Sequence, residues 1–155
     1  MTLFAPFDGT PLSTAALGRA SELATQTGEP LVAATVVPRK RRAAVDHGWL
    51  ADEEAFDADR IQRRLTERVE TVAPDADYRT EYVAGRLTSG AIARRLRDIA
   101  RDVDASIVVM GSTNVGRSAT PANTVSGKVA ARLATDLYIV QATAEAFDPL
   151  LDAVE

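Results

Sequence analysis

Two short segments of this chain contain the residue types that bind an anion. Asp8–Thr10 follows the first apolar run, and Gly111–Ser118 follows the fourth. Glycine and small hydroxyl residues leave backbone N–H groups open to an anion, and a helix that starts next directs its positive N-terminal end at the same place. These segments therefore predict the chemistry of a phosphate-binding site.

Composition excludes several other kinds of site. The chain has no cysteine, which rules out disulfides, thiolate zinc sites, iron–sulfur clusters and a cysteine nucleophile. Its single histidine, His47, cannot form a histidine metal cluster, and it lies in a polar stretch with no nucleophile around it. No nucleophile elbow with a base is visible. We therefore expect no catalytic residue and no metal ligand, and thus a protein that is not an enzyme.

Length and charge indicate one ordinary globular domain. The chain has 155 residues, 46% of them hydrophobic and 26% charged, with a formal net charge of −4. This balance is not typical of a nucleic-acid-binding protein, which would need a basic face. No run reaches the length of a membrane span, and Met1–Phe4 lacks the basic start of a signal peptide. We therefore expect a cytoplasmic protein that binds neither nucleic acid nor membrane.

Short apolar runs alternate with stretches of helical period, which is typical of βα units that build a parallel sheet. We expect five strands, over residues 3–7, 31–37, 78–83, 105–110 and 137–140. Helices are expected around the apolar positions of 12–24, 61–72, 92–103 and 125–133. Pro6 is unusual within a strand, because it cannot donate a ladder hydrogen bond. The basic residues Arg39–Arg42 are interpreted as a solvated loop that opens a polar connection to about Asp52.

The alternation predicts an α/β protein with a single doubly wound, five-stranded parallel sheet and helices on both faces. Ligands of such sheets bind beyond the carboxyl ends of the strands, where the winding direction reverses. A receiver domain is disfavoured, because Asp8 stands alone where an acidic pair is needed. A P-loop ATPase is also disfavoured, because Gly116 is followed by Arg117 and not by lysine.

Four segments together resemble the universal stress protein family. They are residues 6–10 (Pro-Phe-Asp-Gly-Thr), 36–38 (Val-Val-Pro), 108–112 (Val-Val-Met-Gly-Ser) and 138–140 (Tyr-Ile-Val), in order and at fitting intervals. The resemblance implies a family domain over 1–141, which leaves 142–155 as an acidic C-terminal tail. It also implies an adenine-nucleotide alpha-hydrolase-like sheet with the strand order 3-2-1-4-5.

The resemblance implies an adenine-nucleotide site as well. Asp8 would contact the adenine or ribose edge, the backbone near Val36 and Val37 would read the adenine rim, and the glycine loop would hold the phosphates of ATP or AMP, with Mg²⁺. The nucleotide-binding residues expected on this basis are Asp8, Gly9, Thr10, Val36, Val37, Gly111, Ser112, Thr113, Gly116, Arg117, Asn123, Thr124, Val125 and Lys128. A purely structural interpretation of Asp8 is that it caps the first helix or braces a turn.

The phosphate loop departs from the family pattern, which is Gly-x2-Gly-x9-Gly followed by Ser or Thr. Counted from Gly111, the next glycine is Gly116, after four residues and not two. In a second register, which we prefer, Asn123 and Thr124 take the place of the family's Gly-Ser, since asparagine tolerates a left-handed backbone. Thr124 would then cap the last helix and touch phosphate, and Lys128 would reach the same anion.

The function that the resemblance implies is stress-response regulation, by a dimer that senses adenine nucleotide and passes the signal to a protein partner. The expected homodimer pairs the last strand, 137–140, whose edge would otherwise leave unpaired backbone groups beside apolar side chains. The alternative is a protein-interaction module of the same family with a degenerate phosphate loop and no nucleotide. Slow ATP hydrolysis is a third hypothesis, although no general base poised for water is visible.

Overall fold

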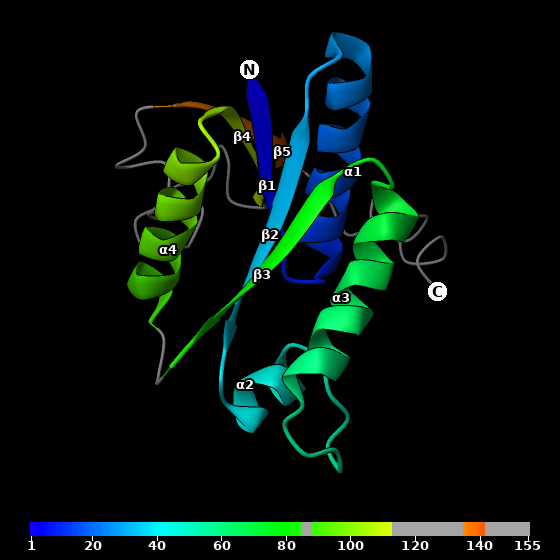
Figure 1. Ribbon diagram of the computed structural model, residues 1–155, viewed down its shortest axis with the longest axis vertical. Helices are drawn as coiled ribbons and strands as arrows, with labels where there is room; N and C mark the ends of the chain where they lie inside the picture. The colour runs from blue at the N-terminus through cyan, green and yellow to red at the C-terminus, as the bar shows by residue number, and fades with distance from the viewer. Residues whose placement is uncertain (85–87, 113–134, 142–155) are drawn as a thin grey trace.

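The protein forms one five-stranded sheet with helices on both of its faces (Figure 1). The computed structural model describes residues 1–84, 88–112 and 135–141. The strands are β1 (Thr2–Pro6), β2 (Leu31–Pro38), β3 (Asp77–Val83), β4 (Ala105–Ser112) and β5 (Asp136–Gln141). The described helices are α1 (Pro11–Thr27), α2 (Arg41–Asp46), α3 (Ala58–Val72) and α4 (Ser89–Asp102). All neighbouring strands are parallel in the order β3-β2-β1-β4-β5, which confirms the predicted doubly wound α/β fold.

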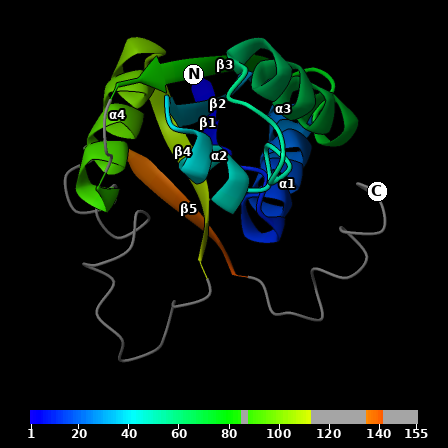
Figure 2. The same cartoon turned by 90° about the horizontal axis from the view of Figure 1, so that it is seen from below.

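A separate hydrophobic core lies on each face of the sheet. Side chains of a strand alternate between the faces, so in β1 Leu3 packs toward α1 and α3, while Phe4 packs toward α4. Figure 2 shows α4 on one side of the sheet and α1 with α3 on the other. The central strand β4 is buried on both faces, with Val108 in one core and Val109 in the other. This confirms its prediction as a central parallel strand.

The helices α1, α3 and α4 lie where the sequence predicts them. In α3 the buried positions are Ile61, Leu65 and Val69, spaced four residues apart on one face. Hydroxyl or carboxylate side chains cap α1, α3 and α4, since Thr10, Asp57 and Thr88 each accept a hydrogen bond from a backbone N–H in the first turn. The left-handed Gly28, at φ +71°, ends α1. The helix expected at 125–133 and the acidic tail 142–155 lie outside the described residues.

Pro6 is the last residue of β1, and its missing N–H interrupts no ladder. β1 pairs with β4 only as far as Phe4 opposite Val108, whereas its pairing with β2 continues to Pro6. Phe7 N–H donates to the carbonyl oxygen of Ala34 at 2.9 Å, which keeps this end of β1 on β2. β1 and β4 thus separate at their carboxyl ends, which is the place where ligands bind in doubly wound sheets.

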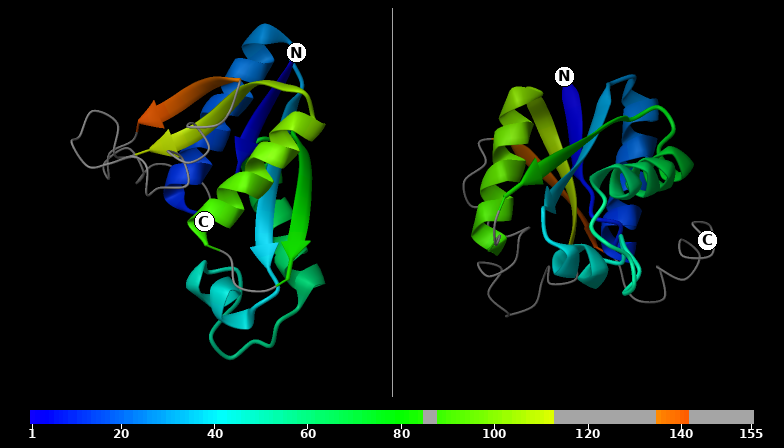
Figure 3. Two further views of the ribbon diagram at one scale, coloured as in Figure 1. Left: turned by 90° about the vertical axis from the view of Figure 1, so that its left-hand side faces the viewer. Right: turned by 60° about the horizontal axis from the view of Figure 1, so that its bottom comes forward.

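The prediction of a loop at Arg39–Arg42 is partly wrong. These four residues are exposed, as expected, but Arg41 and Arg42 begin the short helix α2. Figure 3 shows α2 beyond the carboxyl end of β2, so the connection to α3 lies across this end of the sheet. Arg41 donates to the carbonyl oxygen of Asp52 at 3.1 Å, and Arg42 pairs with Asp46 at 3.4 Å. Local ion pairs and the i,i+4 spacing favour a helical turn here.

Among the described residues, no helix is both long and apolar enough to cross a membrane.

Candidate functional site

A cavity of about 220 Å³ lies at the carboxyl ends of β1, β2 and β4. It opens where β1 and β4 separate, and α1, α4 and the segment after α2 complete its walls. The residues that line it are Pro6, Phe7, Asp8, Thr10, Leu12, Ser13, Thr35, Val36, Pro38, His47, Trp49, Ile92, Leu96, Met110 and Gly111. The cavity therefore occupies the position predicted for ligand binding.

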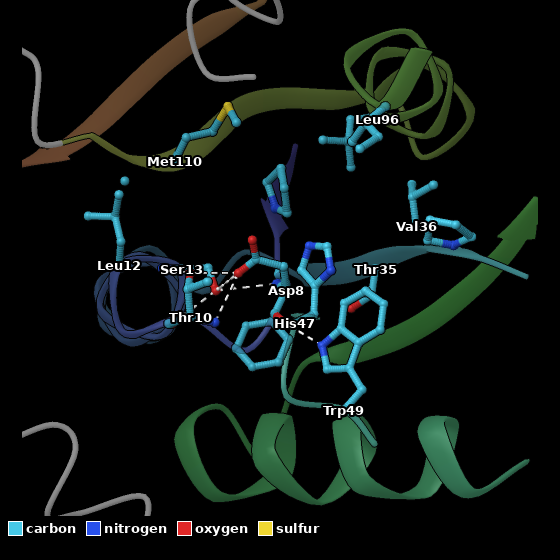
Figure 4. Close-up of a pocket in the computed structure, with 15 residues that line it drawn as sticks. Asp8, Thr10, Leu12, Ser13, Thr35, Val36, His47, Trp49, Leu96 and Met110 are labelled. Atoms are coloured by element: carbon cyan, nitrogen blue, oxygen red, sulfur yellow. Dashed lines mark hydrogen bonds between the residues drawn. The ribbon is translucent and has the colours of Figure 1, made fainter. Parts of the chain in front are cut away.

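The cavity has an apolar side and a polar side. Val36, Leu96 and Met110, from β2, α4 and β4, provide apolar contact surface. Figure 4 shows Asp8 and His47 on the opposite side, with Thr10 and Ser13 next to Asp8. Such a cavity suits a ligand with a flat apolar part and a polar edge, because the apolar walls supply burial and the few polar groups fix its orientation.

Asp8 braces the start of α1 through one carboxylate oxygen. Its Oδ1 accepts hydrogen bonds from the Thr10 N–H (2.9 Å), the Thr10 hydroxyl (2.6 Å) and the Ser13 hydroxyl (2.8 Å). Thr10 in turn caps the helix by accepting from Ser13 N–H at 3.2 Å. Within the described chain Oδ2 has no hydrogen-bond partner, and Figure 4 shows it pointing away from the α1 turn. The structural interpretation of Asp8 is thus confirmed, and Oδ2 takes no part in this brace.

Two predicted site glycines lie among the described residues, and backbone conformation explains Gly9 while close packing explains Gly111. Gly9 has φ +83°, and a Cβ there would lie 2.6 Å from Arg68 Nη1, so it faces α3 and not the cavity. Gly111 lines the cavity, and a Cβ there would lie 2.6 Å from Leu12 Cγ and 2.8 Å from the Leu12 carbonyl oxygen. Gly111 therefore lets β4 approach the first turn of α1.

The remaining predicted residues fall into three groups. Val36 lines the cavity, while the side chain of Val37 is fully buried in the core on the other face, because successive strand residues alternate. Ser112 is the last residue of β4. The other predicted residues of the phosphate loop lie outside the described residues: Thr113, Gly116, Arg117, Asn123, Thr124, Val125 and Lys128.

His47 and Trp49 line the cavity, although neither was among the residues expected at the site and His47 was noted only as part of a polar stretch. Trp49 is only 1% exposed, and its indole Nε1–H donates to the carbonyl oxygen of Asp8 at 2.8 Å. The His47 ring stacks on it, with 4.4 Å between ring centroids and 17° between planes. The apolar pair Trp49 and Leu50 within a polar connection was the available signal, since it indicates a segment that packs onto a core.

An ion-pair cluster anchors the segment that carries Trp49 to α3. Glu54 pairs with Arg60 at 2.6 Å and with Arg64 at 2.8 Å, and Arg64 also donates to the carbonyl oxygen of Trp49 at 2.9 Å. The hydrogen bond from Arg64, with a second one from the Ala51 N–H, lowers the pKa of Glu54 to about 2. The same bond raises the pKa of Arg64. These bonds therefore hold the segment that carries Trp49, and with it this wall of the cavity, against α3.

Beneath the cavity, a polar contact joins β2 to the edge strand β3. Tyr78 O–H donates to Thr35 Oγ1 at 2.8 Å, and Thr35 lines the cavity floor while being only 1% exposed. Burial raises the pKa of Tyr78, so this hydroxyl keeps its proton at neutral pH. The bond satisfies two buried hydroxyl groups and holds Thr35 in place.

The described part of the chain contains no cluster of three or more histidine, cysteine or carboxylate side chains that could hold a metal ion. Asp8 is the one carboxylate among the described residues that line the cavity. Mg²⁺ is commonly held by one or two carboxylates together with the phosphates of a bound substrate. The described residues are therefore compatible with Mg²⁺ that arrives with a nucleotide, and they do not form a protein cage for it.

A parallel sheet in the order β3-β2-β1-β4-β5, with a cavity where β1 and β4 separate, defines a doubly wound α/β protein with a cavity at its switch point, the position where ligands bind in this class of fold. The model of the universal stress protein family matches residues 1–141. The chain therefore belongs to the universal stress protein family. No curated protein matches the chain.

Several solved universal stress proteins share the fold. One, described as a complex with cAMP, is 23% identical, with a TM-score of 0.60 and coverage of 92% of this chain and 98% of that one. Another, from Archaeoglobus fulgidus in complex with dAMP, is 14% identical, with a TM-score of 0.60 and coverage of 91% and 98%. A family member from Burkholderia pseudomallei is 20% identical, with a TM-score of 0.54 and coverage of 91% and 96%.

Proposed function

We propose that this protein is a stress-response regulator that binds an adenine nucleotide, ATP or AMP, in the cavity at the carboxyl ends of β1, β2 and β4. The observation that carries the proposal is that one cavity has both an apolar wall and, on its polar side, the second carboxylate oxygen of Asp8. An adenine base fits between Val36, Leu96 and Met110, and a hydroxyl or amino group of the ligand donates to Asp8. The cAMP and dAMP complexes of two fold relatives support the same ligand class.

The proposed orientation leaves the phosphates at Gly111. This residue ends the cavity on the β4 side, and the glycine- and hydroxyl-containing segment expected to hold phosphate begins there. Mg²⁺ enters with ATP, held mainly by its phosphates. We assign the protein no reaction of its own, and we expect it to act in the cytoplasm by passing the nucleotide signal to a protein partner.

We further propose that two copies pair through β5. This strand is at the edge of the sheet, and its Tyr138 is 42% exposed. An uncovered edge strand presents hydrogen-bonding groups to any other strand, so covering it with a second copy removes a route to aggregation. The dimer would bring two nucleotide sites into one regulatory unit.

The second candidate function is a protein-interaction module of the same family that binds no nucleotide. The observation that favours it is the spacing of four residues between Gly111 and Gly116, where the family pattern has two. The two functions differ in one property, because only a nucleotide sensor is stabilised by ATP or AMP.

The deciding experiment is a titration with AMP and with ATP plus Mg²⁺, in which the melting temperature and the tryptophan emission are both measured. Trp49 is the only tryptophan of the chain and lines the cavity, so its emission reports on the site directly. The matched variant is Asp8→Asn, because its Oδ1 can still accept from Thr10 and Ser13 while the charge is removed from Oδ2. We expect Asp8→Asn to weaken binding about tenfold or more, as for a hydrogen bond to a charged group.

A wild-type protein that responds to neither nucleotide at millimolar concentration would overturn the sensor and leave the interaction module. Equal binding by wild type and Asp8→Asn would show that nucleotide binds without the assigned contact.

A further inference from the structure

His47 is held in a defined orientation on the polar side of the cavity. Its ring stacks on Trp49 at 4.4 Å between centroids, and Trp49 is fixed by its hydrogen bond to the carbonyl oxygen of Asp8. On the other side, His47 Nδ1 lies 2.9 Å from the carbonyl oxygen of Ala43 in α2. A ring held by stacking and by one hydrogen bond loses little further freedom when a ligand binds.

These contacts determine which ring nitrogen can meet a ligand. A carbonyl oxygen only accepts, so Nδ1 carries the proton and donates to Ala43. In the neutral ring, Nε2 then has a lone pair and acts as an acceptor. Within the described chain Nε2 has no hydrogen-bond partner, although His47 lines the cavity.

Asp8 and His47 together give the cavity two hydrogen-bond acceptors on one wall. Among the described residues that line it, these are the one carboxylate and the one imidazole, and Figure 4 shows both on the side opposite Met110 and Leu96. Two acceptors favour a ligand with two neighbouring hydrogen-bond donors. A ligand with acceptors at these positions would form no hydrogen bond with either side chain, which costs binding energy. The vicinal hydroxyl groups of ribose are such donors.

The sugar of a nucleotide lies between its base and its phosphates, and this order places it beside the two acceptors, Asp8 and His47. In the proposed binding mode, the base occupies the apolar side formed by Val36, Leu96 and Met110, and the phosphates lie toward Gly111. The ribose connects base and phosphate and so passes the wall of Asp8 and His47. We infer that His47 is a ligand-contacting residue that accepts a hydrogen bond from a ribose hydroxyl and makes the site prefer ribonucleotides to deoxyribonucleotides.

This inference rests on the proposed nucleotide function, and one set of titrations separates the two. AMP, 2′-deoxy-AMP and 3′-deoxy-AMP are titrated calorimetrically into wild type, His47→Gln and His47→Phe. The phenylalanine ring keeps the stack on Trp49 but has no acceptor, while the glutamine Oε1 can replace Nε2. His47 is an exposed side chain, so both variants should fold, and their melting temperatures without ligand check this.

We expect wild type to bind AMP about three- to tenfold more tightly than at least one deoxy analogue, the size of one neutral hydrogen bond. In His47→Phe this ratio should fall to about one through weaker AMP binding, and His47→Gln should restore part of it. A role in structure alone would weaken all three ligands equally and would overturn the inference. Unchanged AMP binding and an unchanged ratio in His47→Phe would overturn it too, with the nucleotide function intact. Absence of AMP binding to wild type would overturn both.

Discussion

The indole Nε1–H of Trp49 donates to the main-chain oxygen of Asp8 at 2.8 Å, across 41 positions of sequence. This bond attaches the connection after α2 to the carboxyl end of β1, and it places a buried aromatic ring against the residue that braces α1. The cavity wall and the turn at Asp8 therefore form one packed unit.

Trp49→Phe tests this unit. Phenylalanine keeps an aromatic ring for His47 but removes the donor and part of the buried volume, so we expect a loss of about 2 kcal/mol in the free energy of unfolding. Urea unfolding measures the change. The control is Tyr138→Phe, an exposed aromatic change that should stay within about 0.5 kcal/mol of wild type. If Trp49→Phe had the same free energy of unfolding as wild type, the hydrogen bond to Asp8 would add nothing to stability.

Substitution of alanine for Gly111 and for Gly18 should change the stability of the protein in opposite directions. Gly111→Ala would bring a Cβ within 2.8 Å of the Leu12 carbonyl oxygen, a backbone atom that cannot move aside, and should destabilise by about 1–3 kcal/mol. Gly18→Ala in α1 would place its Cβ 3.7 Å from Val72 Cγ1, an ordinary contact, and should stabilise by about 0.5–1 kcal/mol. Thermal unfolding of both variants checks the pair, and a shift of the same sign in both would contradict the packing described for Gly111.

Acid should weaken the anchor of the Trp49 segment in a defined pH range. The Arg64 hydrogen bond lowers the pKa of Glu54 from 4.5 to about 2, so the charged form is favoured in the folded protein. Stability from this lowered pKa is fully present above pH 4.5 and is lost as the pH falls from 4.5 toward 2. We expect the difference in unfolding free energy between wild type and Glu54→Gln to shrink over this range. Urea unfolding at several pH values measures it, and a constant difference would refute the assignment.

The proposed dimer should depend on the exposed edge of β5. Tyr138→Lys places a charge on this edge strand, which disfavours strand pairing, and should weaken self-association about tenfold or more. Light scattering after gel filtration over a range of concentrations measures it, with Tyr138→Phe as the apolar control. A wild-type protein that stays monomeric at every concentration would rule out the dimer.

Local patterns in the sequence determined most of the elements of the fold. The spacing of Ile61, Leu65 and Val69 specified the buried face of α3, and the apolar run at 105–110 specified a central strand. Asp8, Val36 and Gly111 were predicted at the ligand site and do line the cavity. These features were accessible because helix period, strand burial and turn chemistry depend on residues close together in the chain.

Only the tertiary structure decided which residues form the polar wall of the cavity. His47 and Trp49 have no periodic pattern of their own. Trp49 reaches Asp8, with His47 stacked on it, because α2 and the segment after it pack across the end of β1. The backbone near Val36 and Val37 was predicted to contact the ligand, and the structure adds that the Val37 side chain is buried in the core on the other face. The reason for Gly111 became visible only in its contact with Leu12. Such contacts join positions far apart in sequence, so they follow from how whole elements pack, and the local pattern does not specify which residues they join.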